Sequence, residues 1–196
     1  MYGSAKEIPQ KEEYWGNVNC IGLRACYDEG KRVAETLIFE YKRLYNVDVR
    51  VVRIFNTYGV GMNKEDGRII SNFINQAINN EDITIYGSGR QTRSFCYIDD
   101  TLNAIISFMN KEKNTDTPIN IGNPQEIEVK EVATLIKKLT NSKSNIIFCN
   151  EMQDDPPRRR PDINKAIEYL NWKPKIGLED GLKECIKYYR NEGNIT

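Results

Sequence analysis

The sequence contains no histidine. This absence removes the commonest general base and metal ligand of enzymes, together with every serine or cysteine triad that depends on an imidazole. Any acid–base chemistry must therefore come from tyrosine, lysine or carboxylate side chains. The sequence predicts no metal site.

Net charge, long apolar runs and paired cysteines are also missing. The 28 basic and 28 acidic residues cancel, so nothing favours nucleic acid or an anionic membrane as a partner. No apolar run approaches the roughly 20 residues of a membrane span, and the N-terminal MYGSAKE lacks the parts of a signal peptide. The five cysteines form no Cys-x-x-Cys pair. We therefore expect a soluble, cytoplasmic protein with reduced thiols and a small soluble partner.

The length of 196 residues, with 39% hydrophobic residues, suffices for one domain with a core, so we expect a single α/β unit over residues 1–196. Apolar spacing alternates between helix-like and strand-like segments. It predicts helices at 27–45, 69–78, 99–109 with Asp99 as N-cap, 129–139, 163–170 and 178–189. It predicts strands at 47–55, 83–86, 95–98, 119–121 and 146–149, and a loop at 150–161. The first 25 residues show no periodic pattern.

Tyr27 and Lys31 stand four residues apart, so on a helix they share one face. A phenol is protonated at neutral pH, and lowering its pKa by three units requires about 4 kcal/mol. An ammonium about 4 Å away in a partly desolvated site provides roughly that much. The pair can therefore form a phenolate base, although a solvated lysine beside a half-buried tyrosine explains the same spacing. Gly30 lies between them, where it would allow close approach of a cofactor.

Six segments give a more specific signal because they occur in one order along nearly the whole chain. They are RACYDEGKRVAE (24–35), RIFNTYG (53–59), DGRIISNF (66–73), IYGSGRQTRSFCYIDD (85–100), INIGNP (119–124) and QDDPPRRRPDI (153–163). Together they resemble the extended short-chain dehydrogenases/reductases, and within them the UDP-glucuronate decarboxylases. The last segment separates the decarboxylases from related epimerases and dehydratases better than the others.

The resemblance implies an α/β fold, with a partial Rossmann-type parallel sheet joined to a small α/β lobe that binds a sugar nucleotide. It implies NAD as cofactor, a UDP-sugar as substrate and a homodimer when the protein is complete. The implied reaction converts UDP-glucuronate to UDP-xylose and carbon dioxide without net oxidation. A UDP-sugar 4-epimerase or 4,6-dehydratase would share Tyr27 and Lys31 but would not need an arginine for the sugar carboxylate.

The resemblance also implies roles for individual residues. Tyr27 would be the acid/base and would also contact the cofactor, and Lys31 would be its electrostatic partner, which also holds the nicotinamide ribose. Arg159, the middle one of three consecutive arginines, would contact the sugar carboxylate and count as catalytic. The remaining residues would contact the cofactor (Thr57) or the substrate (Asn56, Arg68, Asn72, Tyr86, Gln91 and Arg93).

Structural explanations remain open for several of these positions. An asparagine after a strand, such as Asn56, commonly forms an Asx-turn. The Gly87-Ser88-Gly89 sequence is otherwise usually only a turn, and the three arginines are otherwise a solvated loop.

The family's glycine-rich NAD loop, its acidic adenosine-ribose ligand and its active-site Ser/Thr and Glu lie upstream of the Tyr-Gly pair that is Tyr2-Gly3 here. None is present in this sequence. We therefore expect this chain to correspond to the C-terminal portion of a complete subunit. A UDP-sugar-binding fragment without catalytic activity is the alternative to an enzyme.

Overall fold

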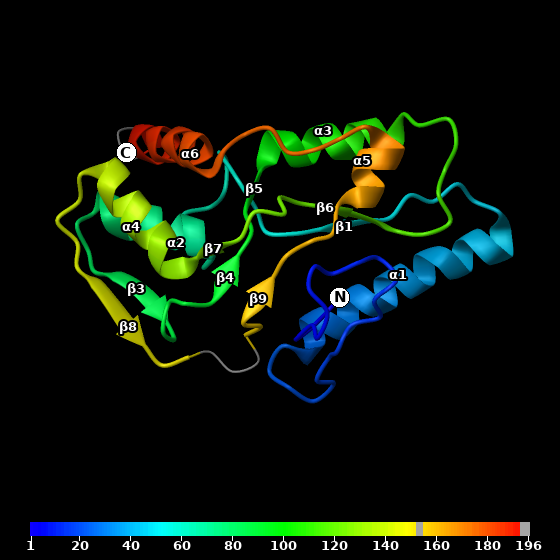
Figure 1. Cartoon of the computed structure of the whole chain (residues 1–196), viewed down its shortest axis with the longest axis horizontal. Helices are drawn as coiled ribbons and strands as arrows, with labels where there is room; N and C mark the ends of the chain where they lie inside the picture. The colour runs from blue at the N-terminus through cyan, green and yellow to red at the C-terminus, as the bar shows by residue number, and fades with distance from the viewer. Residues whose placement is uncertain (152–154, 193–196) are drawn as a thin grey trace.

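The computed structural model describes residues 1–151 and 155–192. Figure 1 shows α2, α4 and α6 grouped at one end of the molecule, α3 and α5 near each other, and α1 beside the N-terminal segment. The helices are α1 (Ala25–Tyr45), α2 (Ile69–Ile78), α3 (Ile98–Met109), α4 (Val129–Thr140), α5 (Asn164–Leu170) and α6 (Leu178–Glu192). The strands are β1 (Val52–Ile54), β2 (Thr57–Tyr58), β3 (Ile83–Tyr86), β4 (Thr92–Arg93), β5 (Cys96–Tyr97), β6 (Ile119–Ile121), β7 (Ile127–Glu128), β8 (Ile146–Cys149) and β9 (Arg158–Arg159).

Parallel pairing dominates the strands, as expected for an α/β chain. The pairs β1–β6, β2–β5 and β3–β8 are all parallel. A fourth sheet has the order β7–β4–β9, in which β4 is antiparallel to β7 and parallel to β9. The predicted α/β class is therefore confirmed.

The larger apolar cluster lies where α2, α4 and α6 pack on one another and on β3 (Figure 1). The apolar faces of α2 and α4 point into it, and Ile74 and Ile136 are fully buried. Glu128 and Glu131 form a capping box at the start of α4, which satisfies backbone N–H groups that the first turn leaves unpaired. Asn141 ends the helix in the left-handed conformation, with φ of 56°. We call this part of the chain the C-terminal lobe.

A second cluster packs β6 against α3 and α5, and includes Phe108, Ile121 and Trp172. Asp100, in the first turn of α3, joins this cluster to the segment at 172–176. The Asp100 carboxylate accepts the backbone N–H groups of Lys175 at 2.9 Å and Ile176 at 2.8 Å. The indole N–H of Trp172 donates to the Asp100 carbonyl at 2.9 Å. Buried polar groups are thus paired where α3 meets the C-terminal segment.

Helix α1 turns its polar face toward the rest of the protein. The least exposed positions recur at spacings of four and three, and are Asp28, Arg32, Glu35, Phe39 and Lys42. The opposite side is an apolar and solvent-exposed arc, which we call the α1 arc: Cys26, Val33, Ala34, Leu37, Ile38, Tyr41, Leu44 and Tyr45. The β1–β6 strand pair next to α1 explains this orientation. Arg53 and Asn120 are partners in its register, so the pair offers polar residues to the helix. The helix therefore docks through polar contacts.

Several predicted boundaries were wrong. The expected strand at 47–55 shortens to β1, because α1 ends at the left-handed Asn46 and the pairing with β6 begins only at Val52. Asp99 is not the N-cap of α3, since the helix begins at Ile98 with Tyr97 as its N-cap. The expected loop at 150–161 contains β9, which pairs with β4. Residues 152–154 of that loop lie outside the described residues.

No helix within the described ranges is both long enough and apolar enough to cross a membrane.

Candidate active site

The first turns of α1 carry the Tyr-x-x-x-Lys pair. The Lys31 Nζ lies 5.7 Å from the centroid of the Tyr27 ring, and the guanidinium carbon of Arg24 lies 5.9 Å from it. Tyr27 is 59% exposed. A Cβ added at Gly30 would meet no atom within 4 Å, so the space beside the glycine is open. The two side chains thus share one accessible face, with positive charge beside the phenol.

The three consecutive arginines differ because two of them form β9. Successive side chains of a strand point to opposite faces. Arg158 lies opposite Thr92 in the parallel register, and both bind the Glu126 carboxylate. Arg159 lies opposite Arg93 instead. The structure therefore separates Arg158, which has an ion-pair partner, from its neighbour.

Arg159 is half-buried, and no carboxylate within the described residues forms an ion pair with it. Its pKa is lowered by burial first, and then by the nearby guanidinium groups of Arg93 and Arg24. Arg93 is 4% exposed and donates to Asp155 at 2.6 Å and to the Thr92 carbonyl at 2.8 Å. The carboxylates of Asp155 and Asp28 act on Arg159 only electrostatically, whereas Asp155 forms an ion pair with Arg93. The arrangement favours an anionic ligand, which would neutralise the remaining charge.

Asp28 and Arg24 of α1 lie within electrostatic range of Arg159. The first turn of α1 therefore lies near the β4–β9 pair, through Arg24 and Asp28. Sequence reasoning missed Arg24, Asp28, Asp155 and Glu126. If a strand had been predicted at 158–159, the alternating direction of its side chains could have indicated that only one of the two arginines forms an ion pair. The neighbouring prolines predicted a loop instead.

The turn after β3 is held by its own atoms. Gly87 and Gly89 have φ of 78° and 75°, which residues with a Cβ rarely adopt. The Gln91 side-chain amide donates to the Tyr86 carbonyl at 2.7 Å, and the Tyr86 ring is 45% exposed. The turn therefore presents the Tyr86 ring to solvent, while the Gln91 amide is partly used in shaping it.

Asn56 lies between β1 and β2, and Thr57 is the first residue of β2. The Asn56 Nδ2 atom is buried and has no hydrogen-bond acceptor among the described residues. A buried donor without a partner costs stability, so a ligand acceptor is expected to satisfy it. The Thr57 hydroxyl is instead bonded within the protein, to the Phe55 carbonyl and the Thr101 hydroxyl, both at 3.0 Å.

Arg68 and Asn72 are the predicted site residues that the structure leaves apart. Arg68 is the N-cap of α2, and its exposed side chain lies 3.6 Å from Asp66. Asn72 is half-buried on α2, where its N–H donates to the Arg68 carbonyl. Among the described residues, no hydrogen bond or ion pair joins either side chain to α1 or to the arginines of β4 and β9. Their roles stay predictions.

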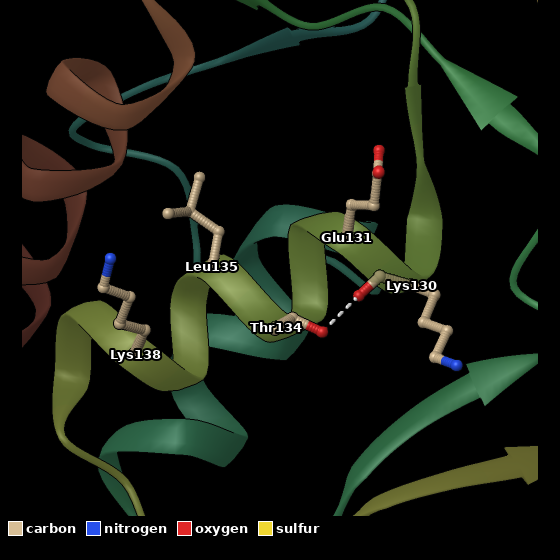
Figure 2. A pocket seen from close by; sticks show the side chains of 5 residues that line it. All are labelled: Lys130, Glu131, Thr134, Leu135 and Lys138. Carbon is tan, nitrogen blue, oxygen red and sulfur yellow. Dashed lines mark hydrogen bonds between the residues drawn. The ribbon is translucent and has the colours of Figure 1, made fainter.

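The depression shown in Figure 2 is a different feature. It is lined by Lys130, Glu131, Thr134, Leu135 and Lys138, all on α4. The Thr134 hydroxyl donates to the Lys130 carbonyl within the helix. None of the predicted site residues lines it, so we do not place the chemistry there.

The residues present fit one end of a nicotinamide cofactor. Tyr27 and Lys31 offer a hydroxyl and an ammonium beside the open space at Gly30. The printed sequence contains no Gly-x-Gly-x-x-Gly motif for a pyrophosphate. The fit therefore covers the ribose and nicotinamide.

Parallel strand pairs flanked by helices, with a Tyr-x-x-x-Lys helix beside paired arginines, define a Rossmann-type α/β protein. The model of the "NAD dependent epimerase/dehydratase family" matches residues 1–122, and the chain belongs to that family.

Similar proteins with curated names are UDP-glucuronic acid decarboxylases. The chain is 53% identical over 192 residues to UDP-glucuronic acid decarboxylase 1 of Xenopus tropicalis, which covers 98% of this chain and 45% of that protein. It is 52% identical over 195 residues to UDP-glucuronic acid decarboxylase 3 of Arabidopsis thaliana, which covers 100% of this chain and 56% of that protein. The chain thus spans about half the length of these relatives.

Solved structures share the fold. A UDP-glucose 4-epimerase from Thermotoga maritima with UDP-glucose superimposes with a TM-score of 0.89 at 26% identity, covering 97% of this chain and 60% of that one. A UDP-glucuronic acid 4-epimerase from Bacillus cereus, in complex with UDP-glucuronic acid and NAD, gives 0.88 at 24% identity, covering 97% and 59%.

Proposed function

We propose that this chain carries the substrate-binding and acid–base part of a UDP-glucuronate decarboxylase that uses NAD and forms UDP-xylose. One observation carries the proposal. Arg159 is half-buried without a carboxylate partner among the described residues, whereas Arg158 is bound to Glu126. A half-buried guanidinium without an ion-pair partner among the described residues, near the first turn of α1, suits a substrate with a carboxylate on its sugar. The named relatives, about half identical over nearly the whole chain, support the same activity.

The reaction requires removal of a proton and a hydride at C4 of the sugar. When bound, NAD supplies the hydride acceptor and later returns the same hydride. Tyr27 accepts the proton of the C4 hydroxyl, and Lys31 stabilises the phenolate electrostatically. The resulting 4-keto sugar loses its carboxylate as carbon dioxide, because the new carbonyl accepts the electron pair. A proton then replaces the lost carboxylate at C5, and Tyr27 returns its proton to the C4 oxygen, so no net oxidation occurs.

The remaining residues bind the nucleotide and cofactor. Arg93 would contact the diphosphate, because a guanidinium group binds phosphate oxygens with paired, charge-assisted hydrogen bonds. Tyr86 and Gln91 would contact the uridine from their turn, and Arg68 and Asn72 would approach it from α2. Lys31 and Thr57 would contact the cofactor, while the unpaired Asn56 amide would bond to the sugar.

The α1 arc supports an assembly. Large contiguous apolar surfaces usually mark an interface. Leu37 is 53% exposed and Leu44 is 71% exposed. We place a second copy of the protein, or the remainder of its own subunit, on this surface. The five free thiols agree with a cytoplasmic location.

The experiment compares two proteins given UDP-glucuronate and NAD. The first is the 196-residue chain, for which we expect no carbon dioxide release, because its sequence lacks the glycine-rich motif that seats the NAD pyrophosphate. The second joins to Met1 the residues that precede the matched region of the Xenopus tropicalis relative, and it should release carbon dioxide and form UDP-xylose. Turnover by the chain alone would contradict the expectation, and an inactive fusion that binds NAD would contradict the function.

Product analysis also separates the alternatives within the family. A 4-epimerase would give UDP-galacturonate from UDP-glucuronate without carbon dioxide. A UDP-sugar-binding fragment would bind UDP-glucuronate without any product from the fusion. Formation of UDP-xylose excludes both.

A further inference from the structure

A cluster of polar side chains lies between α1 and the β1–β6 pair. The residues come from four separate parts of the chain: the N-terminal segment (Tyr2, Gln10 and Glu12), α1 (Glu35), β1 (Arg53) and β6 (Asn120). Figure 1 shows the N-terminal segment beside α1. Gln10, Glu12 and Asn120 are at most 8% exposed, so each of their polar groups needs a partner within the protein. None of these residues has been assigned a role above.

The α1 side of the cluster is an ion pair with two parallel hydrogen bonds. The Arg53 Nε donates to Glu35 Oε2 at 2.9 Å, and Nη2 donates to Oε1 at 2.6 Å. The two side chains are only 13% and 15% exposed. Burial lowers the pKa of Arg53, but the hydrogen bonds that Arg53 donates to Glu35 and Tyr2 outweigh it and raise the pKa overall, so the guanidinium stays charged. This pair is less exposed than the Lys42–Asp116 pair near the end of the helix.

A single hydroxyl connects this ion pair to β6. The Arg53 Nη1 donates to the Tyr2 hydroxyl at 2.7 Å, and that hydroxyl donates to Asn120 Oδ1 at 2.8 Å. The Arg53 guanidinium also lies 4.9 Å from the centroid of the Tyr2 ring. Burial raises the pKa of Tyr2, so its hydroxyl remains a donor at neutral pH.

From Asn120 the network continues to the arginine segment. The Asn120 Nδ2 donates to the Gln10 carbonyl at 3.0 Å and to the Asp162 carbonyl at 3.2 Å. Gln10 in turn binds the backbone on both sides: Arg160 N donates to Gln10 Oε1 at 2.9 Å, and Asp162 N donates to the Gln10 carbonyl at 2.8 Å. A continuous path of hydrogen bonds therefore leads from Glu35, eight residues after Tyr27, to the residue that follows Arg159.

We propose that Tyr2 and Arg53 are positioning residues, which fix the helix of Tyr27 and Lys31 relative to the arginine segment of β9. Their role rests on the proposed function, since it matters only if both sides contact one substrate. The α1 arc is exposed, so apolar packing within the described residues does not set the direction of α1. The buried polar path is what joins the two sides of the site.

Removal of a single oxygen atom, the hydroxyl of Tyr2, interrupts this hydrogen-bonded path. Tyr2→Phe keeps the ring and removes the hydroxyl between Arg53 and Asn120, and Arg53→Lys keeps the charge but loses the paired donors. Asp116→Asn is the control, because it weakens an α1 ion pair that does not lead to β9. Amide hydrogen exchange of the 196-residue chain, without ligand, is measured by mass spectrometry in all four proteins. The buried amides of α4 serve as the internal reference for global folding.

We expect Tyr2→Phe and Arg53→Lys each to speed exchange in both 27–35 and 158–162 by about tenfold, the factor that corresponds to one hydrogen bond to a charged group. Exchange in α4 should stay unchanged, and Asp116→Asn should leave 158–162 unaffected. An increase confined to α1, or none in either segment, would overturn the proposal. If one variant also speeds exchange in α4, its global fold is destabilised, and the other variant then tests the proposal.

A second arm separates this inference from the proposed function. UDP-glucuronate is added, and protection is followed at 158–162 and at 27–35. In the unaltered chain both segments should become protected, whereas Tyr2→Phe should keep protection at 158–162 and lose it at 27–35. A role in general stability would not move the two segments differently. Absence of protection in the unaltered chain would count against the function alone, since the ligand-free arm decides the positioning role.

Discussion

The C-terminal lobe and helix α1 use amphipathic helices in opposite ways. In the lobe, the apolar faces of α2 and α4 point inward, and Ile74 and Ile136 are fully buried. On α1 the apolar arc points outward, and Leu37 and Leu44 are more than half exposed. Helix α3 is intermediate, because Phe108 is buried while Ile106 is 54% exposed. The difference teaches that apolar spacing identifies a face of a helix but does not say what covers it.

Thiol chemistry gives the largest expected contrast, between the buried cores and the exposed surface that includes the α1 arc. Burial raises the pKa of Cys96 to about 11 and of Cys185 to about 12, so both stay protonated at pH 8 and ionise only as the pH rises toward those values. We expect iodoacetamide at pH 8 to modify them slower than the exposed cysteines by about two orders of magnitude or more. Mass spectrometry of the labelled chain measures each site.

The same labelling experiment measures whether the α1 arc is accessible to solvent. Cys26 lies on that arc and Cys149 is exposed on the lobe, so the two should react alike if the arc is open. Selective protection of Cys26 that disappears on dilution would instead show a second copy on α1.

Core truncation should separate the two regions next most strongly. Ile74→Ala removes a fully buried side chain from the lobe and should lower the free energy of unfolding by about 3 kcal/mol. Leu37→Ala removes an exposed side chain and should change it by less than about 0.5 kcal/mol. Urea denaturation measures both free energies of unfolding, and their dependence on urea concentration should stay unchanged. Equal losses would mean that the α1 arc is covered in solution.

Much of this fold could be predicted from the sequence, but its contacts could not. The helix at 69–78 and the strand at 83–86 match exactly, because their apolar residues are both periodic and buried. The strands β4 and β9 were missed because two residues carry no periodicity, and only pairing between distant segments creates them. The direction of α1 was not predictable either, since it depends on Arg53 and Glu35, which are 18 residues apart.

Substitutions of Arg158 and Arg159 test whether β9 presents an unpaired positive charge near α1. In the fusion protein, Arg159→Ala should cut decarboxylation at least about tenfold, because a charge-assisted hydrogen bond contributes about 1.5 to 3 kcal/mol. Binding of UDP, measured by calorimetry, should change little. Arg158→Ala is the matched control, and it should lose only the partly exposed pair with Glu126. Equal effects of the two substitutions would remove the residue-level support for a decarboxylase.

The smallest effect concerns two matched helix ends. Asn46 ends α1 and Asn141 ends α4, with φ of 52° and 56°. Glycine accepts this conformation more readily than asparagine, so Asn141→Gly should raise the free energy of unfolding by about 0.5 kcal/mol. Asn46→Gly should leave the global transition unchanged, because α1 is expected to unfold apart from the lobe. Equal shifts in thermal melts would place α1 within the same cooperative unit.

The short strand β9 also bears on how this chain tolerates insertions and deletions. A slip of one residue in its pairing with β4 would exchange inward and outward side chains. Because Arg158, Arg159 and Arg160 are consecutive, a slip in either direction still places an arginine opposite Arg93. The triplet thus makes the positive charge of the site robust to length changes in the preceding loop. A one-residue deletion there should be tolerated better in this chain than in a variant with alanine at positions 158 and 160.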